Sequence, residues 1–298
     1  MKRNAIARIV IWSLVVLLLT SILIMGINSS PSSFFSGNWS FGVTGISYKN
    51  AALYNVGGGA VNDEFYGVEI EWINGKIEIE GYDGDRTDIS ETETSDDSYK
   101  LRWRVEDGVL KIHPAAAGMR YGFKKMPKKT LTLKIPVSAA DKLKFISTDS
   151  TSAEIEINRI TVSNKIELDT VSGDATLRNV KAEKLDIETV SGDIRADGEF
   201  IELETDSVSG DVSVTTAVPL KKFDGQSTSG NIALALPQES GFTLEADTVS
   251  GDISCQLPTV SESRNRRVCG DGSAEFKTDT VSGDVIITDG DFFKKSLS

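Results

Sequence analysis

A five-residue turn sequence that recurs about every twenty residues is the feature that most constrains the fold of this chain. The copies read TVSGD at 170–174, 189–193, 248–252 and 280–284, SVSGD at 207–211, STSGN at 227–231 and, in a degenerate form, STSAE at 150–154. Their glycines are Gly173, Gly192, Gly210, Gly230, Gly251 and Gly283, separated by 19, 18, 20, 21 and 32 residues. Repetition at a nearly fixed period predicts a repeat architecture.

Apolar residues alternate with polar ones on both sides of each turn, as in Ile166 and Leu168 before one turn and Ala175 and Leu177 after it. A period of two predicts two short strands per repeat, each with one buried face. A unit of this size cannot bury its own apolar face, so neighbouring units must stack. We therefore predict an all-β fold, a β-solenoid of stacked two-strand coils. The alternative is an antiparallel meander or sandwich built from hairpins.

The region before the repeats is less regular. Alternation over 65–80 is interrupted by Asn74-Gly75, which fits a hairpin or the first solenoid turn, and 101–112 and 130–135 add further strands. The acidic stretch 83–97 and the basic stretch 120–129 are interpreted as solvated loops. The solenoid domain is predicted to span 65–291, followed by a tail at 292–298.

The N-terminal region predicts a membrane anchor. Residues 9–27 carry no charge, and a helix of that length measures about 28 Å, close to the hydrocarbon thickness of a bilayer. A cleaved signal peptide is the alternative, but its apolar region is shorter and ends in a small-residue cleavage site. Lys2, Arg3 and Arg8 precede the apolar run and predict that residues 1–8 stay in the cytoplasm. Residues 28–64 then form a Ser/Gly-rich juxtamembrane linker, and the domain lies outside the cell membrane.

The charge balance excludes several classes of function. The net charge is −12, which argues against nucleic-acid binding, because that depends on Lys and Arg neutralising phosphates. The single histidine, His113, excludes zinc sites built on two or three imidazoles. No nucleophile motif surrounds it, so we expect a surface or packing histidine, no cofactor and no enzymatic activity. A polysaccharide-cleaving enzyme that uses a carboxylate pair remains an alternative.

The acidic turn residues are the sharpest candidate site. Stacked turns would bring these carboxylates about 5 Å apart, and calcium favours such oxygen ligands. The competing interpretation is structural, since Asp at a turn commonly accepts hydrogen bonds from backbone amides and Gly there supplies a positive φ. The candidates are Asp174, Asp193, Asp211, Asp252 and Asp284, with Asn231 in the same series.

The long final spacing contains two further features. Cys255 and Cys269 are the only cysteines, and an exported domain permits a disulfide between them. The alternative is a core cysteine and a free loop thiol. Arg264, Arg266 and Arg267 form a basic cluster that fits either an anionic partner or a solvated loop.

The repeated turns, together with the segment LTLKIP at 131–136, resemble the bacterial putative-adhesin family, a domain of unknown function that is similar to LiaG-like and head-GIN adhesin domains. The resemblance implies the repeat fold and a membrane-anchored protein, adhesin-like or linked to the envelope-stress response. It carries over no catalytic residues. We expect a non-enzymatic interaction protein whose partner is a protein or a cell-surface polymer. A regulatory or sensing partner of another membrane protein is the alternative.

Overall fold

The computed structural model describes residues 46–92, 94, 96–119, 126–140, 142–263 and 265–290. These residues form strands and three short 3-10 helices, η1 (Ala51–Leu53), η2 (Asp97–Tyr99) and η3 (Val137–Ala139). The strands are β1 (Asn55–Val56), β2 (Gly59–Val61), β3 (Gly67–Tyr82), β4 (Thr87–Glu91), β5 (Arg102–Glu106), β6 (Val109–His113), β7 (Lys129–Pro136), β8 (Phe145–Asn158), β9 (Lys165–Ser172), β10 (Ala175–Ser191), β11 (Ile194–Ser209), β12 (Val212–Thr216), β13 (Lys222–Ser229), β14 (Ile232–Leu236), β15 (Phe242–Ser250), β16 (Ile253–Cys255), β17 (Thr259–Ser263), β18 (Arg266–Cys269), β19 (Ala274–Ser282) and β20 (Val285–Asp289).

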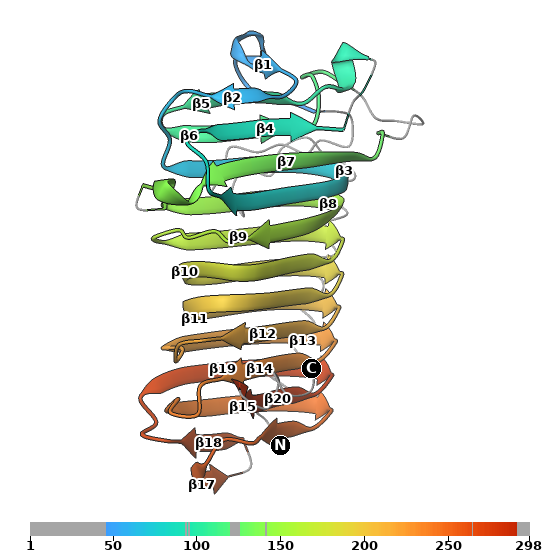
Figure 1. Ribbon diagram of the computed structural model, residues 1–298. Helices are drawn as coiled ribbons and strands as arrows, with labels where there is room; N and C mark the ends of the chain where they lie inside the picture. Colours follow the sequence, from blue (N-terminus) through green and yellow to red (C-terminus); the bar gives the residue numbers. More distant parts are fainter. Residues whose placement is uncertain are drawn as a thin grey trace.

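The strands stack as successive coils along one long axis (Figure 1). Each coil has one strand segment before its turn and one after it; β3 and β8 run through the turn, and β10 and β11 each run from one coil into the next. The strands before the turns pair side by side in what we call the first layer, and those after the turns pair in the second layer. Pairing between coils is parallel and in register, with Ser172 beside Ser191 and Ser191 beside Ser209. The all-β, solenoid-like prediction is confirmed, and the antiparallel meander is not the arrangement of the coils.

The core lies between the two layers and follows the predicted alternation. Ile166, Leu168, Ala175 and Leu177 are all buried, as are their counterparts in the other coils. Toward the C-terminal end, large aromatic rings fill the space: Phe276 stacks on Phe242 with ring centroids 4.2 Å apart. Removing this apolar surface from water is the main favourable contribution to folding.

Antiparallel strands close the N-terminal end of the stack. Strands β6 and β7 lie parallel to the two halves of β3, and β5, β1, β4 and β2 add to them in antiparallel pairs. Asn74-Gly75 belongs to the first solenoid turn, because Asn74 pairs with Ser152 and Gly75 with Ala153 in the next coil. The predicted linker 28–64 therefore includes folded structure: Ile46, Tyr54 and Val61 are buried in this cap.

The last two coils do not follow the order of the sequence. Strand β13 pairs with β19, and β19 pairs with β15, so the coil with the turn at Gly283 lies between the coils at Gly230 and Gly251. The same inversion occurs in the second layer, where β20 lies between β14 and β16. The 32-residue spacing arises because the chain leaves one coil position empty after the Gly230 coil, forms the Gly251 coil beyond it, and then returns to form the Gly283 coil in between.

The inversion brings two connections into close contact: residues 237–241, which join β14 to β15, and residues 270–273, which join β18 to β19. A Cβ at Gly241 would lie 1.8 Å from the Asp271 carboxylate, and one at Gly270 would lie 2.9 Å from the Cα of Gly241. Gly270 and Gly272 also have positive φ values of 55° and 68°, a region that glycine enters without steric cost. Crossing connections are uncommon in β-sheets, and here they depend on glycines.

No helix within the described residues is long and apolar enough to cross a membrane. The predicted anchor at 9–27 and the tail at 292–298 lie outside the described residues.

Candidate interaction surface

The outward side chains of the first layer form a column of carboxylates that no basic residue neutralises. In-register pairing places Asp149 beside Asp169, Asp169 beside Glu188, and Glu188 beside Asp206. Neighbouring parallel strands are about 4.8 Å apart, so each carboxylate faces the next at roughly that spacing. None of the four makes a hydrogen bond or ion pair with another described residue. We call Asp149, Asp169, Glu188 and Asp206 the carboxylate column.

A second acidic column runs alongside, two residues earlier in each strand, and it is neutralised. Lys165 lies 2.9 Å from both Glu167 and Asp186, and Lys184 lies 3.0 Å from Asp186 and 2.5 Å from Glu204. Stacked like charges are destabilising unless opposite charges lie between them. Among the described residues, lysines thus form ion pairs with the second acidic column but not with the carboxylate column.

Protonation of the carboxylate column reflects its surroundings. Burial, together with the neighbouring acidic residues, raises the pKa of Asp149 and of Asp206 to about 7 and that of Asp169 to about 9. The pKa of Glu188 is raised for the same reasons. A positively charged group that approached this column would lower these pKa values and favour the ionised form.

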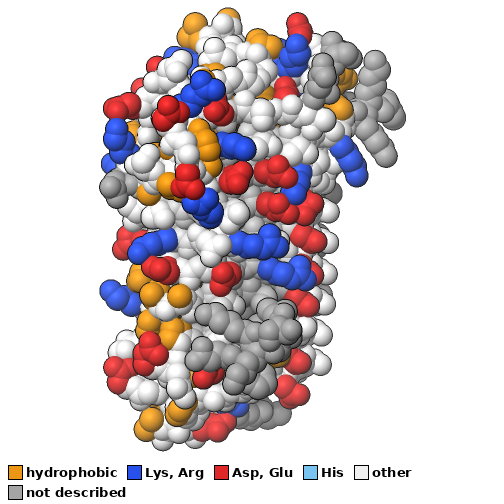
Figure 2. Space-filling model, viewed as in Figure 1, with side chains coloured by type: hydrophobic (Ala, Val, Ile, Leu, Met, Phe, Trp, Pro, Cys, Tyr) orange, Lys and Arg blue, Asp and Glu red, His pale blue; other side chains and the backbone are white. Residues whose placement is uncertain are grey.

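A stripe of apolar side chains borders the column on the turn side. The valines of the repeated turns point outward and are partly exposed, most of all Val249 at 43%. The stripe consists of Val171, Val190, Val208, Val281 and Val249. Figure 2 shows acidic side chains recurring at successive levels along the stack, with Lys and Arg interspersed on the face in view.

The predicted turn aspartates form a separate ladder of hydrogen bonds. Asp174 Oδ1 accepts from the backbone N–H of Asp193 at 2.9 Å, and Asp193 Oδ1 accepts from that of Asp211 at 3.1 Å. The ladder continues from Asp211 to Asn231, Asp284 and Asp252 in their spatial order. Because Asn231 accepts in the same way as its Asp neighbours, the ladder requires an oxygen rather than a charge. The described residues contain no group of three or more acidic, His or Cys side chains arranged to hold a metal ion.

The turn glycines are required mainly by the close approach of stacked backbones. A Cβ at Gly192 would lie 2.2 Å from the carbonyl oxygen of Gly173, and one at Gly210 would lie 2.1 Å from that of Gly192. The same contact recurs at Gly173, Gly230, Gly283 and Gly251. Only Gly173 and Gly192 among them have a positive φ, 155° and 152°. The expected reason, a positive φ, therefore applies to two turns, whereas steric exclusion applies to all six.

A family model for the Toastrack DUF4097 domain matches residues 68–219 and 199–288. The chain belongs to this family. It is also similar to two solved structures, each 13% identical to it. One, a putative cell adhesion protein from Clostridium sporogenes ATCC 15579, has a TM-score of 0.38 over 79% of this chain and 99% of its own. The other, a putative adhesin from Bacteroides fragilis NCTC 9343, has a TM-score of 0.44 over 78% and 97%. A comparison with curated protein sequences gave no match.

The two cysteines of this Toastrack domain lie next to one another. Cys255 in β16 and Cys269 at the end of β18 have their sulfur atoms 3.3 Å apart, as two thiols. Of the basic cluster, Arg267 pairs with Glu262 at 2.9 Å and donates to the carbonyl of Ile253 at 2.7 Å. Arg266 is exposed, and Arg264 lies outside the described residues. The cluster thus helps to close the end of the stack.

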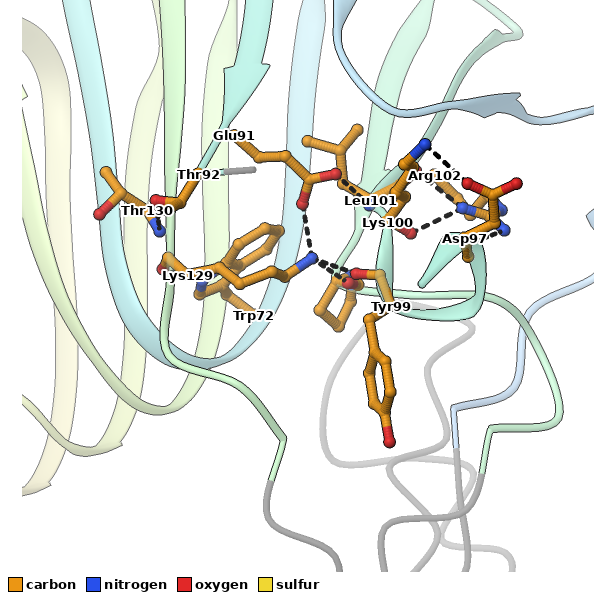
Figure 3. A network of polar contacts seen from close by, with 11 residues as sticks. Trp72, Glu91, Thr92, Asp97, Tyr99, Lys100, Leu101, Arg102, Lys129 and Thr130 are labelled. Carbon is orange, nitrogen blue, oxygen red and sulfur yellow. Dashed lines mark hydrogen bonds and ion pairs between the residues drawn. The ribbon is translucent and has the colours of Figure 1, made fainter. Parts of the chain in front are cut away.

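The N-terminal cap of the Toastrack domain contains a buried ion pair that the sequence analysis missed (Figure 3). The Lys129 ammonium lies 2.6 Å from Glu91 and donates to the backbone carbonyls of Tyr99 at 2.5 Å and Pro114 at 2.7 Å. The other Glu91 oxygen accepts from the N–H of Leu101 at 2.8 Å. The interpretation of 83–97 and 120–129 as solvated loops is therefore wrong for these two residues, whose side chains are buried at the ends of β4 and β7. The sequence contains an indication that Lys129 is buried, because it lies two and four residues before the buried Leu131 and Leu133 and so points to the same face of β7.

A second buried pair in the cap involves the single histidine. His113 Nδ1 lies 3.0 Å from Glu71, Nε2 lies 3.3 Å from the Tyr54 hydroxyl, and Tyr48 stacks on the ring at 4.0 Å. His113 is 1% exposed and Glu71 is 5% exposed. Of the two expected roles, surface or packing, the burial of His113 fits the packing role.

Proposed function

We propose that this protein is a non-enzymatic, adhesin-like binding module that is anchored in the cell membrane by residues 9–27 and presents its Toastrack domain outside the cell. The carboxylate column supports this proposal most directly. It is an extended, partly exposed row of acidic groups without cations, on a rigid sheet that repeats one spacing. Extended repeat surfaces are suited to binding elongated partners.

The chemistry of the column favours a cationic partner. The raised pKa values keep part of the column protonated near neutral pH, and a basic protein segment or a cationic cell-surface polymer would bind its ionised form preferentially. The valine stripe beside them would bury apolar surface in the same contact. A basic, partly apolar segment of another membrane protein would fit equally, which corresponds to the regulatory alternative.

Crosslinking on intact cells, followed by mass spectrometry, tests the proposal. The test variant replaces Asp149, Asp169, Glu188 and Asp206 by Asn or Gln. The matched control replaces four acidic residues of the second layer, Glu78, Glu80, Glu154 and Glu156, by Gln. We expect the test variant to lose the partner and the control to keep it. Equal loss in both variants, or retention in both, would contradict the assignment of the surface.

The identity of the crosslinked partner separates the two functional classes. Recovery of wall polymer or a host surface component supports adhesion, whereas a single membrane protein supports regulation. Protease treatment of intact cells tests the topology, because an exported domain is digested while residues 1–8 remain protected.

A further inference from the structure

The hairpin β17–β18 occupies the position that the next coil would take in an ordinary solenoid. Strand β18 pairs antiparallel with the outer edge of β15, from Phe242 opposite Cys269 to Glu245 opposite Arg266. If the coils followed the order of the sequence, β19 would pair with that same edge. The hairpin therefore excludes the sequential order by occupying its site.

Nothing in the coils themselves prevents the sequential order. Strand β19 pairs in the same register with both neighbours: Ser282 lies beside Ser229 on one side and beside Ser250 on the other. Because the turn sequences around Gly251 and Gly283 are identical, β15 fits the edge of β13 as β19 does. Backbone register therefore does not choose between the two orders, and the connecting segment is an element that can.

The two cysteines are placed where they can make that choice. Cys255 is in the last strand of the second layer, and Cys269 is the residue of β18 opposite Phe242 in the first layer. Their sulfur atoms are 3.3 Å apart, so a small movement brings them to the bonding distance of about 2.05 Å. A bond here would hold β18 against the terminal coil.

We propose that Cys255 and Cys269 form a disulfide latch that holds the β17–β18 hairpin on the outer edge of β15 and thereby fixes the inverted order of the last two coils. The bond forms by exchange with a disulfide of an exported thiol–disulfide oxidoreductase. One cysteine thiolate attacks that disulfide, breaks it and forms a mixed disulfide with the donor. The second cysteine thiolate then attacks the sulfur of the first cysteine, which forms the Cys255–Cys269 bond and releases the donor. The donor leaves as a dithiol that carries the two protons. The latch rests on the proposed export of the domain.

The thiols are poorly reactive once the hairpin is closed. Cys269 is fully buried, and burial, together with the adjacent Cys269 thiol, raises the pKa of Cys255 to about 12. A thiol must ionise to attack a disulfide. The mixed disulfide with the donor therefore forms before the hairpin closes, closure brings the two cysteines together, and the buried Cys269 sulfur is then shielded from reductants.

The first test counts thiols in the full-length protein, purified in detergent and refolded in a glutathione redox buffer. We expect no free thiol after denaturation and a mass 2 Da below that of the reduced chain. The melting temperature should exceed that of the reduced protein by roughly 6–12 °C, as the closure of a loop of about 15 residues implies. The Cys255→Ser and Cys269→Ser variants should match the reduced protein. Two titratable thiols, or equal melting temperatures, would overturn the proposal.

The second test reads the order of the coils directly with a short bifunctional thiol crosslinker. Ala233 of β14 lies beside Ile286 of β20, and Ile286 lies beside Ser254 of β16. One reporter pair is Ala233→Cys with Ile286→Cys, and the other is Ala233→Cys with Ser254→Cys. With the latch, only the 233–286 pair should crosslink. After refolding with Ser at 255 and 269, the 233–254 crosslink should also appear, and its absence would show that the latch does not select the order.

These outcomes are separable from the proposed function. A protein that latches in redox buffer but is isolated from cells with free thiols would contradict export and leave the latch intact. Free thiols in both cases would overturn the latch alone, because the carboxylate column does not depend on it.

Discussion

The middle coils, from β9 to β14, differ in construction from the two ends of the stack. In the middle, one set of contacts recurs in every coil: turn glycines in contact with carbonyl oxygens, Asp oxygens that accept from the next coil, and alternating apolar side chains. At the ends, each contact occurs once. Lys129 with Glu91 and His113 with Glu71 hold the N-terminal cap, and crossing glycines with a hairpin close the other end.

The difference shows that repetition stabilises a backbone arrangement, whereas closing it requires particular side chains. Every interior coil satisfies its backbone groups on the coils above and below. The end coils have free edges that would pair with other chains. Natural repeat proteins meet this problem with atypical terminal repeats, and here antiparallel strands fill that role at both ends. Five substitutions sharpen the comparison, and they follow from the largest expected effect to the smallest.

Phe276→Ala should be the most damaging change. Phe276 belongs to the inserted coil and contacts Phe242 and Phe223, at 4.2 and 5.8 Å between ring centroids, in the coils on either side. We expect a loss of about 4–5 kcal/mol in the free energy of unfolding, measured by denaturant titration. Leu185→Ala in a middle coil is the control, and an equally large loss there would mean that the inserted coil is not special.

Lys129→Met should cost about 3–4 kcal/mol, because it leaves the Glu91 carboxylate buried without a cation. The double variant Lys129→Met/Glu91→Leu should recover much of the loss. The measurement is the melting temperature of each variant, which should be higher for the double variant. Equal melting temperatures would show that the network contributes through packing alone.

Gly192→Ala should cost about 2–3 kcal/mol, since the added Cβ would clash with the carbonyl oxygen of the preceding coil. Gly118→Ala is the matched control at the N-terminal end. Gly118 has a φ of 83° with open space around it, so only strain of about 1 kcal/mol is expected. If the two variants unfold at the same denaturant concentration, steric exclusion is not what fixes the turn glycines.

Asp169→Asn should stabilise the protein at pH 8 by at least about 1 kcal/mol. The pKa of Asp169 is raised to about 9 in the folded state, so the folded chain binds a proton that the unfolded chain releases above its own pKa of about 4. The wild type should therefore lose stability as the pH rises from about 4 to 9. Melting curves across this range should show a smaller slope for the variant, and an unchanged slope would refute the assignment.

Asp211→Ala should cost about 0.5–1.5 kcal/mol by removing the acceptor for the Asn231 N–H. Asp211→Asn should be close to neutral, because Asn231 already acts as an acceptor in the same ladder. If the Asn variant is as unstable as the Ala variant in thermal melts, charge contributes to the ladder after all.

The sequence predicts the middle of the molecule well because each observation there is made several times. Parity, turn chemistry and spacing all point to the same stack. Each contact at the ends of the stack occurs only once, so the spacing of residues along the chain does not predict it. Glu91 and Lys129 are 38 residues apart in the chain, and no local pattern pairs them, although the parity of Lys129 marks it as inward. In the sequence, the inverted order of the last two coils is indicated only by the long spacing and by the glycines at 241, 270 and 272. The sequence does not show that lysines neutralise only one of the two acidic columns. That depends on the register between strands, which places Lys165 next to Asp186.

The inserted coil also makes the final arrangement of one segment depend on a segment that is synthesised after it. Residues 242–255 emerge from the ribosome before residues 274–289, yet in the folded stack they pair with the strands formed by those later residues. A chain that stops at residue 273 lacks β19 and β20, so its β15 can reach the stack only by pairing with the edge of β13, in the order of the sequence. Only a chain that contains residues 274–289 can adopt the inverted order, so the order of the last coils records whether these residues were present when the stack closed.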